Sequence, residues 1–189
     1  MMLETIKRWR RMRELPSHLK QTKLHAIDAA VEATGGHALA DLGGVWAVDG
    51  GYALYALDRY DLTRVVICDD DFTEPLERRA RRDVRLSLVQ GNFGLERVAD
   101  QLGEVDILLL FDVLLHQVAP DWDEVLERYA PRTRAFVLAG PWWTGSATTR
   151  LTDLPKAEYL DLVPMREFHA EIYDRLDEFN PRRGRAWRD

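Results

Sequence analysis

Acidic residues stand at or near the ends of several apolar runs in this chain. Asp41 lies near the end of the run 37–42, Asp69 directly follows 64–68, and Asp112 directly follows 105–111. A carboxylate accepts hydrogen bonds from hydroxyl groups, and its two oxygens can hold neighbouring hydroxyls of a ribose. We therefore expect these acids to mark a binding site.

The segment Gln90-Gly91-Asn92-Phe93 follows another such run. This segment resembles the position after the third strand where class I S-adenosylmethionine-dependent methyltransferases bind the adenine amino group. The resemblance implies that Asn92, which has both a donor and an acceptor, meets the adenine edge and that Phe93 packs on the ring. The alternative is that Gly91 and Asn92 simply form a turn.

Three residues are candidates for chemistry beside these acids. A histidine side chain ordinarily changes charge near neutral pH, so His116 could act as a general base, although a structural hydrogen bond at the turn after the run 105–111 is the alternative role. Trp142 and Trp143 could form an aromatic platform for a substrate, or they could be a packing anchor against a C-terminal helix.

Short apolar runs alternate with helical patterns, which predicts parallel βαβ units. We expect strands over 37–42, 64–68, 85–89, 105–111 and 135–139, with helices over 22–33, 51–59, 75–82, 95–101 and 123–130. In the first helix, Leu24 and Ile27 are expected to face the core and Lys23 the opposite side. The runs 105–111 and 135–139 are apolar enough to be strands covered on both faces.

With 189 residues and 46% apolar side chains, the chain is expected to form one domain. We expect a basic N-terminal helix or arm over 1–21, a core over 22–140 and a helical C-terminal extension over 141–189. The single cysteine, Cys68, argues against internal disulfides and zinc sites built from several cysteines. No segment has the features of a signal peptide or a membrane span, so we expect a cytoplasmic protein.

The segment 38–44, which leads to Gly50-Gly51-Tyr52, resembles the first motif of the class I S-adenosylmethionine-dependent methyltransferases. The resemblance implies that Asp41, Gly43 and Gly44 hold the methionine part of S-adenosylmethionine. Of the three alternating glycine positions of the family, this chain keeps the first and has Val45 and Ala47 at the other two. Either the longer loop bulges so that Trp46 or Tyr52 lies near the sulfonium, or the cofactor site is altered or lost.

Asp69, at the end of the second predicted strand, is a candidate for binding the ribose of the cofactor. We assign Asp69 to the ribose hydroxyls, with Asp70 as the substitute. The alternative is that Asp69, Asp70 and Asp71 cap the next helix, as Asp71 or Thr73 is expected to do. Because adjacent side chains point in different directions, we expect no metal site in this triplet.

The segment Asp112-Val113-Leu114-Leu115-His116 resembles the strand and D-x-L-x-H segment of small-molecule methyltransferases. The resemblance covers about residues 37–140 in the right order. It implies a doubly wound, Rossmann-like α/β fold with a mostly parallel sheet of strand order 3-2-1-4-5, and in-line methyl transfer to an oxygen or nitrogen. Asp112 is then expected on the cofactor side or as a cap rather than as a catalyst.

The family usually completes its sheet with two antiparallel strands, for which this sequence offers no candidate. The last strand would then be an exposed apolar edge, covered by C-terminal helices or by a second subunit in a homodimer. One alternative function is a binding protein that keeps the fold without catalysis. Another is an RNA-modifying methyltransferase that uses the arginine-rich ends, although the net charge of −6 gives no general attraction to nucleic acid and such ends are commonly solvated. A dinucleotide-dependent oxidoreductase is a more distant alternative, because Gly-x-Gly-x-x-Gly is absent from the first turn.

Overall fold

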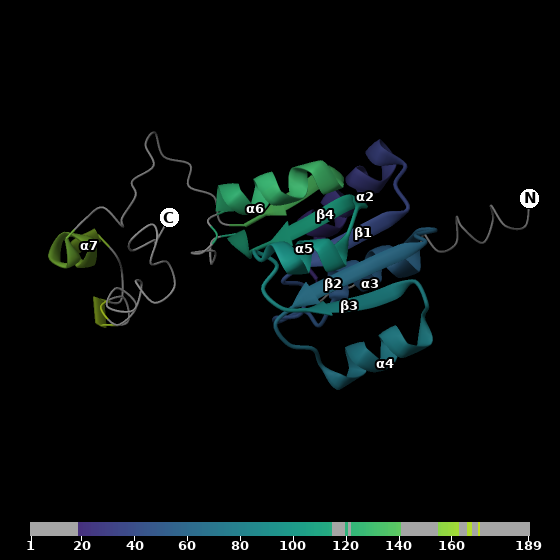
Figure 1. Cartoon of the computed structure of the whole chain (residues 1–189), viewed down its shortest axis with the longest axis horizontal. Coiled ribbons are helices and arrows are strands. Elements are labelled where there is room, and N and C mark those ends of the chain that lie inside the picture. Colours follow the sequence, from purple (N-terminus) through teal and green to yellow (C-terminus); the bar gives the residue numbers. More distant parts are fainter. Residues whose placement is uncertain are drawn as a thin grey trace, which may run out of the picture.

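A parallel sheet with helices on both sides dominates the structure (Figure 1). The computed structural model describes residues 19–114, 120, 122–140, 155–162, 166–167 and 170. Five strands form the sheet, namely β1 (Ala38–Leu42), β2 (Arg64–Asp69), β3 (Leu86–Gln90), β4 (Val105–Phe111) and β5 (Thr133–Ala139). Their order is β3-β2-β1-β4-β5, and every neighbouring pair is parallel. This confirms the predicted fold class and strand order.

The helices that precede β5 cover the two faces of the sheet, and the last helix follows β5. They are α2 (Gln21–Thr34), α3 (Gly51–Arg59), α4 (Glu74–Arg82), α5 (Glu96–Leu102), α6 (Trp122–Tyr129), the 3-10 turn η2 (Ala130–Arg132) and α7 (Lys156–Leu162). Figure 1 shows α5 and α6 on one side of the sheet, and α4 beyond the β3 edge. The five helices predicted between 22 and 130 all form, each within one residue of the expected bounds.

Alternating residues of the central strands supply two separate hydrophobic cores. On one face, Leu39 of β1 and Ile107 of β4 pack with Leu24 and Ile27 of α2 and with α3. The opposite face has its own core, formed by Ala40, Leu42, Val66, Cys68, Leu108 and Leu110 together with side chains of α5 and α6. A central strand buried on both faces must be apolar at nearly every position, as predicted for β4. The same expectation for 135–139 is wrong, because β5 is an edge strand in which Val137 is the only buried residue and Leu138 is exposed.

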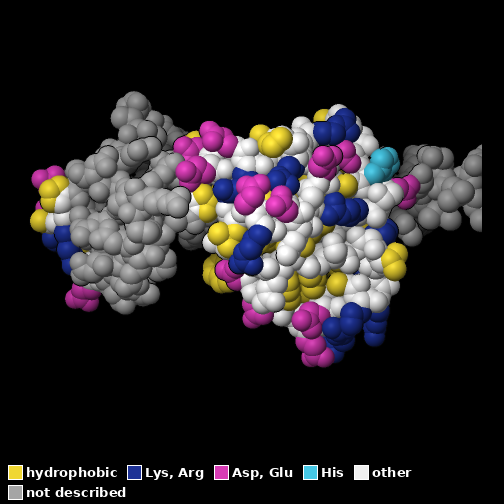
Figure 2. All heavy atoms as spheres, in the orientation of Figure 1, with side chains coloured by type: hydrophobic (Ala, Val, Ile, Leu, Met, Phe, Trp, Pro, Cys, Tyr) yellow, Lys and Arg dark blue, Asp and Glu magenta, His cyan; other side chains and the backbone are white. Residues whose placement is uncertain are grey.

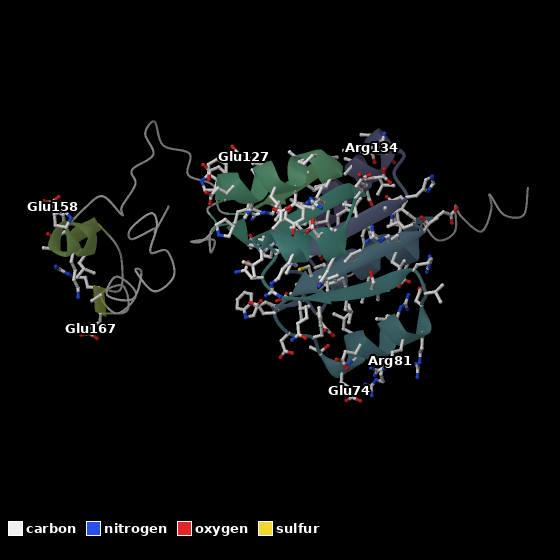
Figure 3. The ribbon with its side chains drawn as sticks, in the orientation of Figure 1. Glu74, Arg81, Glu127, Arg134, Glu158 and Glu167 are labelled. Carbon is white, nitrogen blue, oxygen red and sulfur yellow. The ribbon has the colours of Figure 1, made fainter. Side chains whose placement is uncertain are left out.

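Local sequence sets the ends of α4. Thr73 is its N-cap, and the Thr73 side chain accepts a hydrogen bond of 3.4 Å from the backbone N–H of Leu76. Glu74 lies in the first turn and Arg81 in the last, where each complements the helix dipole. Figure 3 shows both side chains on the outer side of the helix. Of the two residues expected to cap α4, the structure therefore selects Thr73.

Charged side chains of both signs are mixed over the face shown in Figure 2. Arg132 pairs with Glu96 at 2.7 Å and with Asp100 at 2.8 Å, and Arg128 pairs with Glu96 at 2.9 Å, so α5 is tied to α6 and η2. Exposed pairs of this kind contribute little to stability individually.

β5 lies at one edge of the sheet, and no strand follows it among the described residues. The predicted basic arm falls outside the described residues up to position 18. Within the described part of the chain, no helix has the length and apolar character to cross a membrane.

Candidate functional site

Three acids meet at the carboxyl edge of the sheet. Asp41 is the penultimate residue of β1, Asp69 is the last residue of β2, and Asp112 immediately follows β4. Because β1 lies between β2 and β4 with all three parallel, their carboxyl ends face the same edge. Open α/β sheets bind their ligands at this edge.

The chain leaves β1 through a turn that requires glycine at two positions. Gly43 has φ +69°, and its N–H donates to the Cys68 carbonyl at 2.7 Å. A Cβ at Gly43 would lie 2.5 Å from Cγ1 of Val113, and a Cβ at Gly44 would lie 2.5 Å from Oδ2 of Asp41. The backbone therefore approaches two side chains too closely for any larger residue.

Asp69 holds the loop that follows this turn. Its Oδ2 accepts a hydrogen bond of 2.8 Å from the backbone N–H of Val45, and its Oδ1 accepts one of 2.8 Å from that of Asp70. Each carboxylate oxygen has a second lone pair, so these bonds leave capacity for a ligand. Asp70 is exposed.

The rest of the loop keeps a glycine-like backbone without glycine. Ala47 has φ +64°, a left-handed conformation at one of the two family glycine positions that this chain has replaced. The loop ends at Gly50, whose N–H donates to the Gly44 carbonyl at 2.9 Å. Trp46 projects from the loop with 86% of its surface exposed.

A second bond ties the loop to α4. The Thr73 hydroxyl donates to Oδ1 of Asp49, and the same hydroxyl oxygen caps α4 by accepting from the N–H of Leu76. Asp49, with φ +50°, directly precedes the loop's last glycine. The loop is therefore held by Asp69 near its start and by Thr73 near its end.

Asp41 is the most unusual group of the site. Only 1% of its surface is exposed, and its Oδ2 has no hydrogen-bond partner among the described residues. Burial, and to a smaller extent the nearby charge of Asp69, raise the pKa of Asp41 to about 7 against the opposing effects of Lys23 and of a backbone hydrogen bond with Ala53. A carboxyl group with one unpaired oxygen thus lies directly beneath the glycine turn.

The expectation that Lys23 lies on the solvent side of its helix is wrong. Lys23 is 6% exposed, and its Nζ lies 2.5 Å from Oδ2 of Asp112. The ammonium also lies 5.2 Å from the ring centre of Tyr52 and 5.1 Å from that of Phe111. Lys23 is four residues before Ile27, so the two share a helix face, and this spacing was the available signal in the sequence.

Asn92 and Phe93 have local structural roles. Oδ1 of Asn92 accepts a hydrogen bond of 2.7 Å from the N–H of Gly94, which makes the segment a turn, as in the simpler interpretation. Phe93 is buried in the core under α5 and α6, and a Cβ at Gly43 would lie 3.7 Å from its ring. The Tyr129 hydroxyl donates to the Phe93 carbonyl at 2.8 Å. Both predicted adenine-site residues therefore belong to the same edge of the sheet as the glycine turn.

The predicted acceptor-side residues His116, Trp142 and Trp143 lie outside the described residues. The structure therefore places the predicted cofactor side only. Among the described residues, no group of three or more His, Cys, Asp and Glu side chains could hold a metal ion.

The strand order and the glycine turn at the end of β1 agree with the resemblance seen in the sequence. The described part of the chain has a doubly wound, Rossmann-like fold. An O-methyltransferase family protein from Burkholderia thailandensis is similar over 60% of this chain, with 21% identity and a TM-score of 0.46. Mitomycin 7-O-methyltransferase is similar over 59% of the chain, with 21% identity and a TM-score of 0.41. Coclaurine N-methyltransferase, solved with N-methylheliamine and S-adenosylhomocysteine, is similar over 65%, with 16% identity and a TM-score of 0.43.

These similarities cover only part of each protein. This chain matches 35%, 32% and 36% of the three methyltransferases, respectively. No protein-family model and no curated protein sequence matches the chain. The site itself must therefore carry any assignment of function.

Proposed function

We propose that this chain is a methyltransferase that uses S-adenosylmethionine to methylate an oxygen or nitrogen of a small molecule. The observation that carries the proposal is the buried Asp41 carboxyl group, whose Oδ2 is unpaired beneath Gly44 at the carboxyl edge of the sheet. An unpaired buried carboxyl group is costly, and such groups concentrate at binding sites.

The residues present fit this cofactor. When bound, S-adenosylmethionine supplies a methyl group on a positively charged sulfur. Asp69 and Asp112 bring negative charge to the edge where the cofactor would lie, beside the buried Asp41 carboxyl group, and Gly43 and Gly44 place no side chain there. A cation near Asp41 would also favour the charged form of that carboxyl group.

Different residues of the site would bind the methionine, ribose and adenine parts of the cofactor. Asp41 and the two glycines face the methionine part. Asp69 binds the ribose hydroxyls with its remaining lone pairs, and Asp70 is the alternative. Oδ1 of Asn92 accepts one hydrogen bond in the turn, so the NH₂ group and the second lone pair of Oδ1 are the parts that meet the adenine edge, beside Phe93.

The acceptor side rests on the sequence. The D-x-L-x-H resemblance supports a small-molecule acceptor, with His116 as the base that removes a proton from it. Trp142 and Trp143 would form a wall of the acceptor site. A homodimer through the β5 edge and RNA binding through the arginine-rich ends stay predictions, and salt-dependent RNA binding lost on removal of residues 1–13 would favour the second.

Calorimetry with S-adenosylmethionine and S-adenosylhomocysteine tests the proposal. We expect wild-type dissociation constants of about 1 to 100 μM. Asp69→Asn should bind about tenfold more weakly, because the ribose hydroxyls then donate to a neutral amide oxygen and not to a charged carboxylate. Asp71→Asn is the matched control, because Asp71 is an exposed acid two positions further along and should not affect binding. If Asp70→Asn loses affinity and Asp69→Asn does not, Asp70 holds the ribose.

The wild-type result decides between the candidate functions. Absence of binding would contradict a methyltransferase. Binding without transfer to any acceptor in a screen would instead favour a protein that keeps the cofactor site without catalysis.

A further inference from the structure

The ion pair between Lys23 and Asp112 joins α2 to the end of β4. The buried ammonium of Lys23 lies 2.5 Å from Oδ2 of Asp112, against the edge-to-face pair of Tyr52 and Phe111. Removing an ammonium group from water is costly, so a buried lysine needs such a partner. This pair places a largely buried positive charge beside the candidate site.

Asp112 is held in an unusual conformation while its side chain stays accessible. Its φ is +58°, and its backbone N–H donates to the Ala139 carbonyl of β5 at 2.7 Å. The side chain is 40% exposed. A non-glycine residue in this backbone region is strained, and such strain clusters at binding sites.

A second cation lies at the surface beside this carboxylate. Nζ of Lys20 is 3.9 Å from Oδ2 of Asp112, and the Lys20 side chain is 70% exposed. The backbone N–H of Lys20 is also held by the Tyr52 hydroxyl at 3.2 Å. Solvent therefore meets an accessible carboxylate and an accessible ammonium side by side, with the buried ammonium of Lys23 behind them.

We propose that Asp112 and Lys20 bind an α-amino acid group, Asp112 accepting from its ammonium and Lys20 donating to its carboxylate, with Lys23 as the positioning residue for Asp112. A zwitterion brings one charge of each sign, so it leaves both accessible protein charges paired and buries no net charge. A simple anion would offer no new partner to Asp112, and a simple cation would offer none to Lys20.

This inference rests on the proposed function, because it assigns the group to the amino-acid end of S-adenosylmethionine. It adds three points to that proposal, namely the part of the cofactor that Asp112 contacts, the participation of Lys20 and the role of Lys23. It also predicts that α2, which precedes the first strand, forms part of the cofactor site.

The experiment compares two ligands that differ at this end. S-adenosylhomocysteine carries the amino acid group, whereas 5′-methylthioadenosine has the same nucleoside and sulfur without it. Calorimetry with the wild type should show the first ligand binding about tenfold or more tightly than the second, which is the amount that a charge-assisted contact contributes.

The variants test each residue through the ratio of the two dissociation constants, that for 5′-methylthioadenosine divided by that for S-adenosylhomocysteine. Asp112→Asn and Lys20→Met should each weaken S-adenosylhomocysteine binding several-fold, by about three- to tenfold, with little change for 5′-methylthioadenosine. Lys23→Met should lower the same ratio, and Lys23→Arg, which keeps the charge, should restore much of it. Arg82→Met is the matched control, because Arg82 is an exposed cation on α4 and should leave both affinities unchanged. Binding of 5′-methylthioadenosine by each variant shows that the variant is folded.

Three results would overturn the inference. If the wild type binds both ligands equally, the amino acid group is not recognised, although the nucleoside site and the proposed function stand. If Lys23→Met weakens both ligands by the same factor, or if Lys23→Arg restores nothing, Lys23 has a purely structural role. If the wild type binds neither ligand, the proposed function fails together with this inference.

Discussion

The buried carboxyl group of Asp41 should make the stability of the protein depend on pH in a direction opposite to that of an ordinary salt-bridged acid. Its pKa is about 7 in the folded protein, whereas its ordinary value is 3.8. The folded state therefore holds a proton that the unfolded chain releases. This contribution to stability is fully present below pH 3.8 and is lost as the pH rises through 7.

The size of the effect follows from these two values. The difference between them corresponds to about 4 kcal/mol of free energy of unfolding over the full range. Between pH 5 and pH 8 the share lost is about 2.5 kcal/mol. Asp41→Asn keeps the shape of the side chain but cannot ionise, so its stability should lack this loss.

Urea unfolding of the wild type and of Asp41→Asn at pH 5 and pH 8 measures the difference. We expect the wild type to lose about 2.5 kcal/mol more than the variant between these two conditions. Asp71→Asn, at an exposed position, should follow the wild type. If Asp41→Asn shows the same pH dependence as the wild type, the carboxyl group does not keep its proton near neutral pH and the argument for a buried, unpaired acid is wrong.

Three further substitutions test the glycine turn, the loop and a buried hydroxyl by chemical unfolding. Gly44→Ala should cost about 2 kcal/mol, because its Cβ would overlap with Oδ2 of Asp41, and Asp41→Ala in the same chain should recover part of that loss; strict additivity would argue against the overlap. Ala47→Gly should raise stability by up to about 1 kcal/mol, since φ is +64° there, and a decrease would show that this backbone is not strained. Tyr129→Phe should cost about 1 kcal/mol because the Phe93 carbonyl loses its donor, and an unchanged midpoint would mean that water replaces the hydroxyl.

The fold was largely predictable because each central strand is a short apolar run with an acid at or next to its end. β4 spans the same residues as its prediction, and β5 begins two residues earlier, at Thr133. The alternation with helices indicated a parallel sheet, but the strand order came from the resemblance. The acids Asp41 and Asp69 were recognisable because strand ends are fixed by the pattern itself.

The contacts of the site were less predictable, because they depend on which residues meet across the fold. Lys23 and Asp112 are 89 positions apart, and a lysine is normally exposed, so nothing local indicates their pairing. Asp69 was expected to face a ligand, and its bond to Val45 depends on how the loop folds back. The left-handed conformation of Ala47 likewise follows from these tertiary bonds and not from its own preference.

The Thr73 hydroxyl joins two elements through a single oxygen, since it donates to Asp49 and accepts from the N–H of Leu76. Any fluctuation that frays the first turn of α4 would also release the end of the glycine loop. The two segments should therefore open together in native-state hydrogen exchange, with similar opening free energies. In this arrangement, opening of the loop at the carboxyl edge of the sheet is coupled to the stability of the surface helix α4.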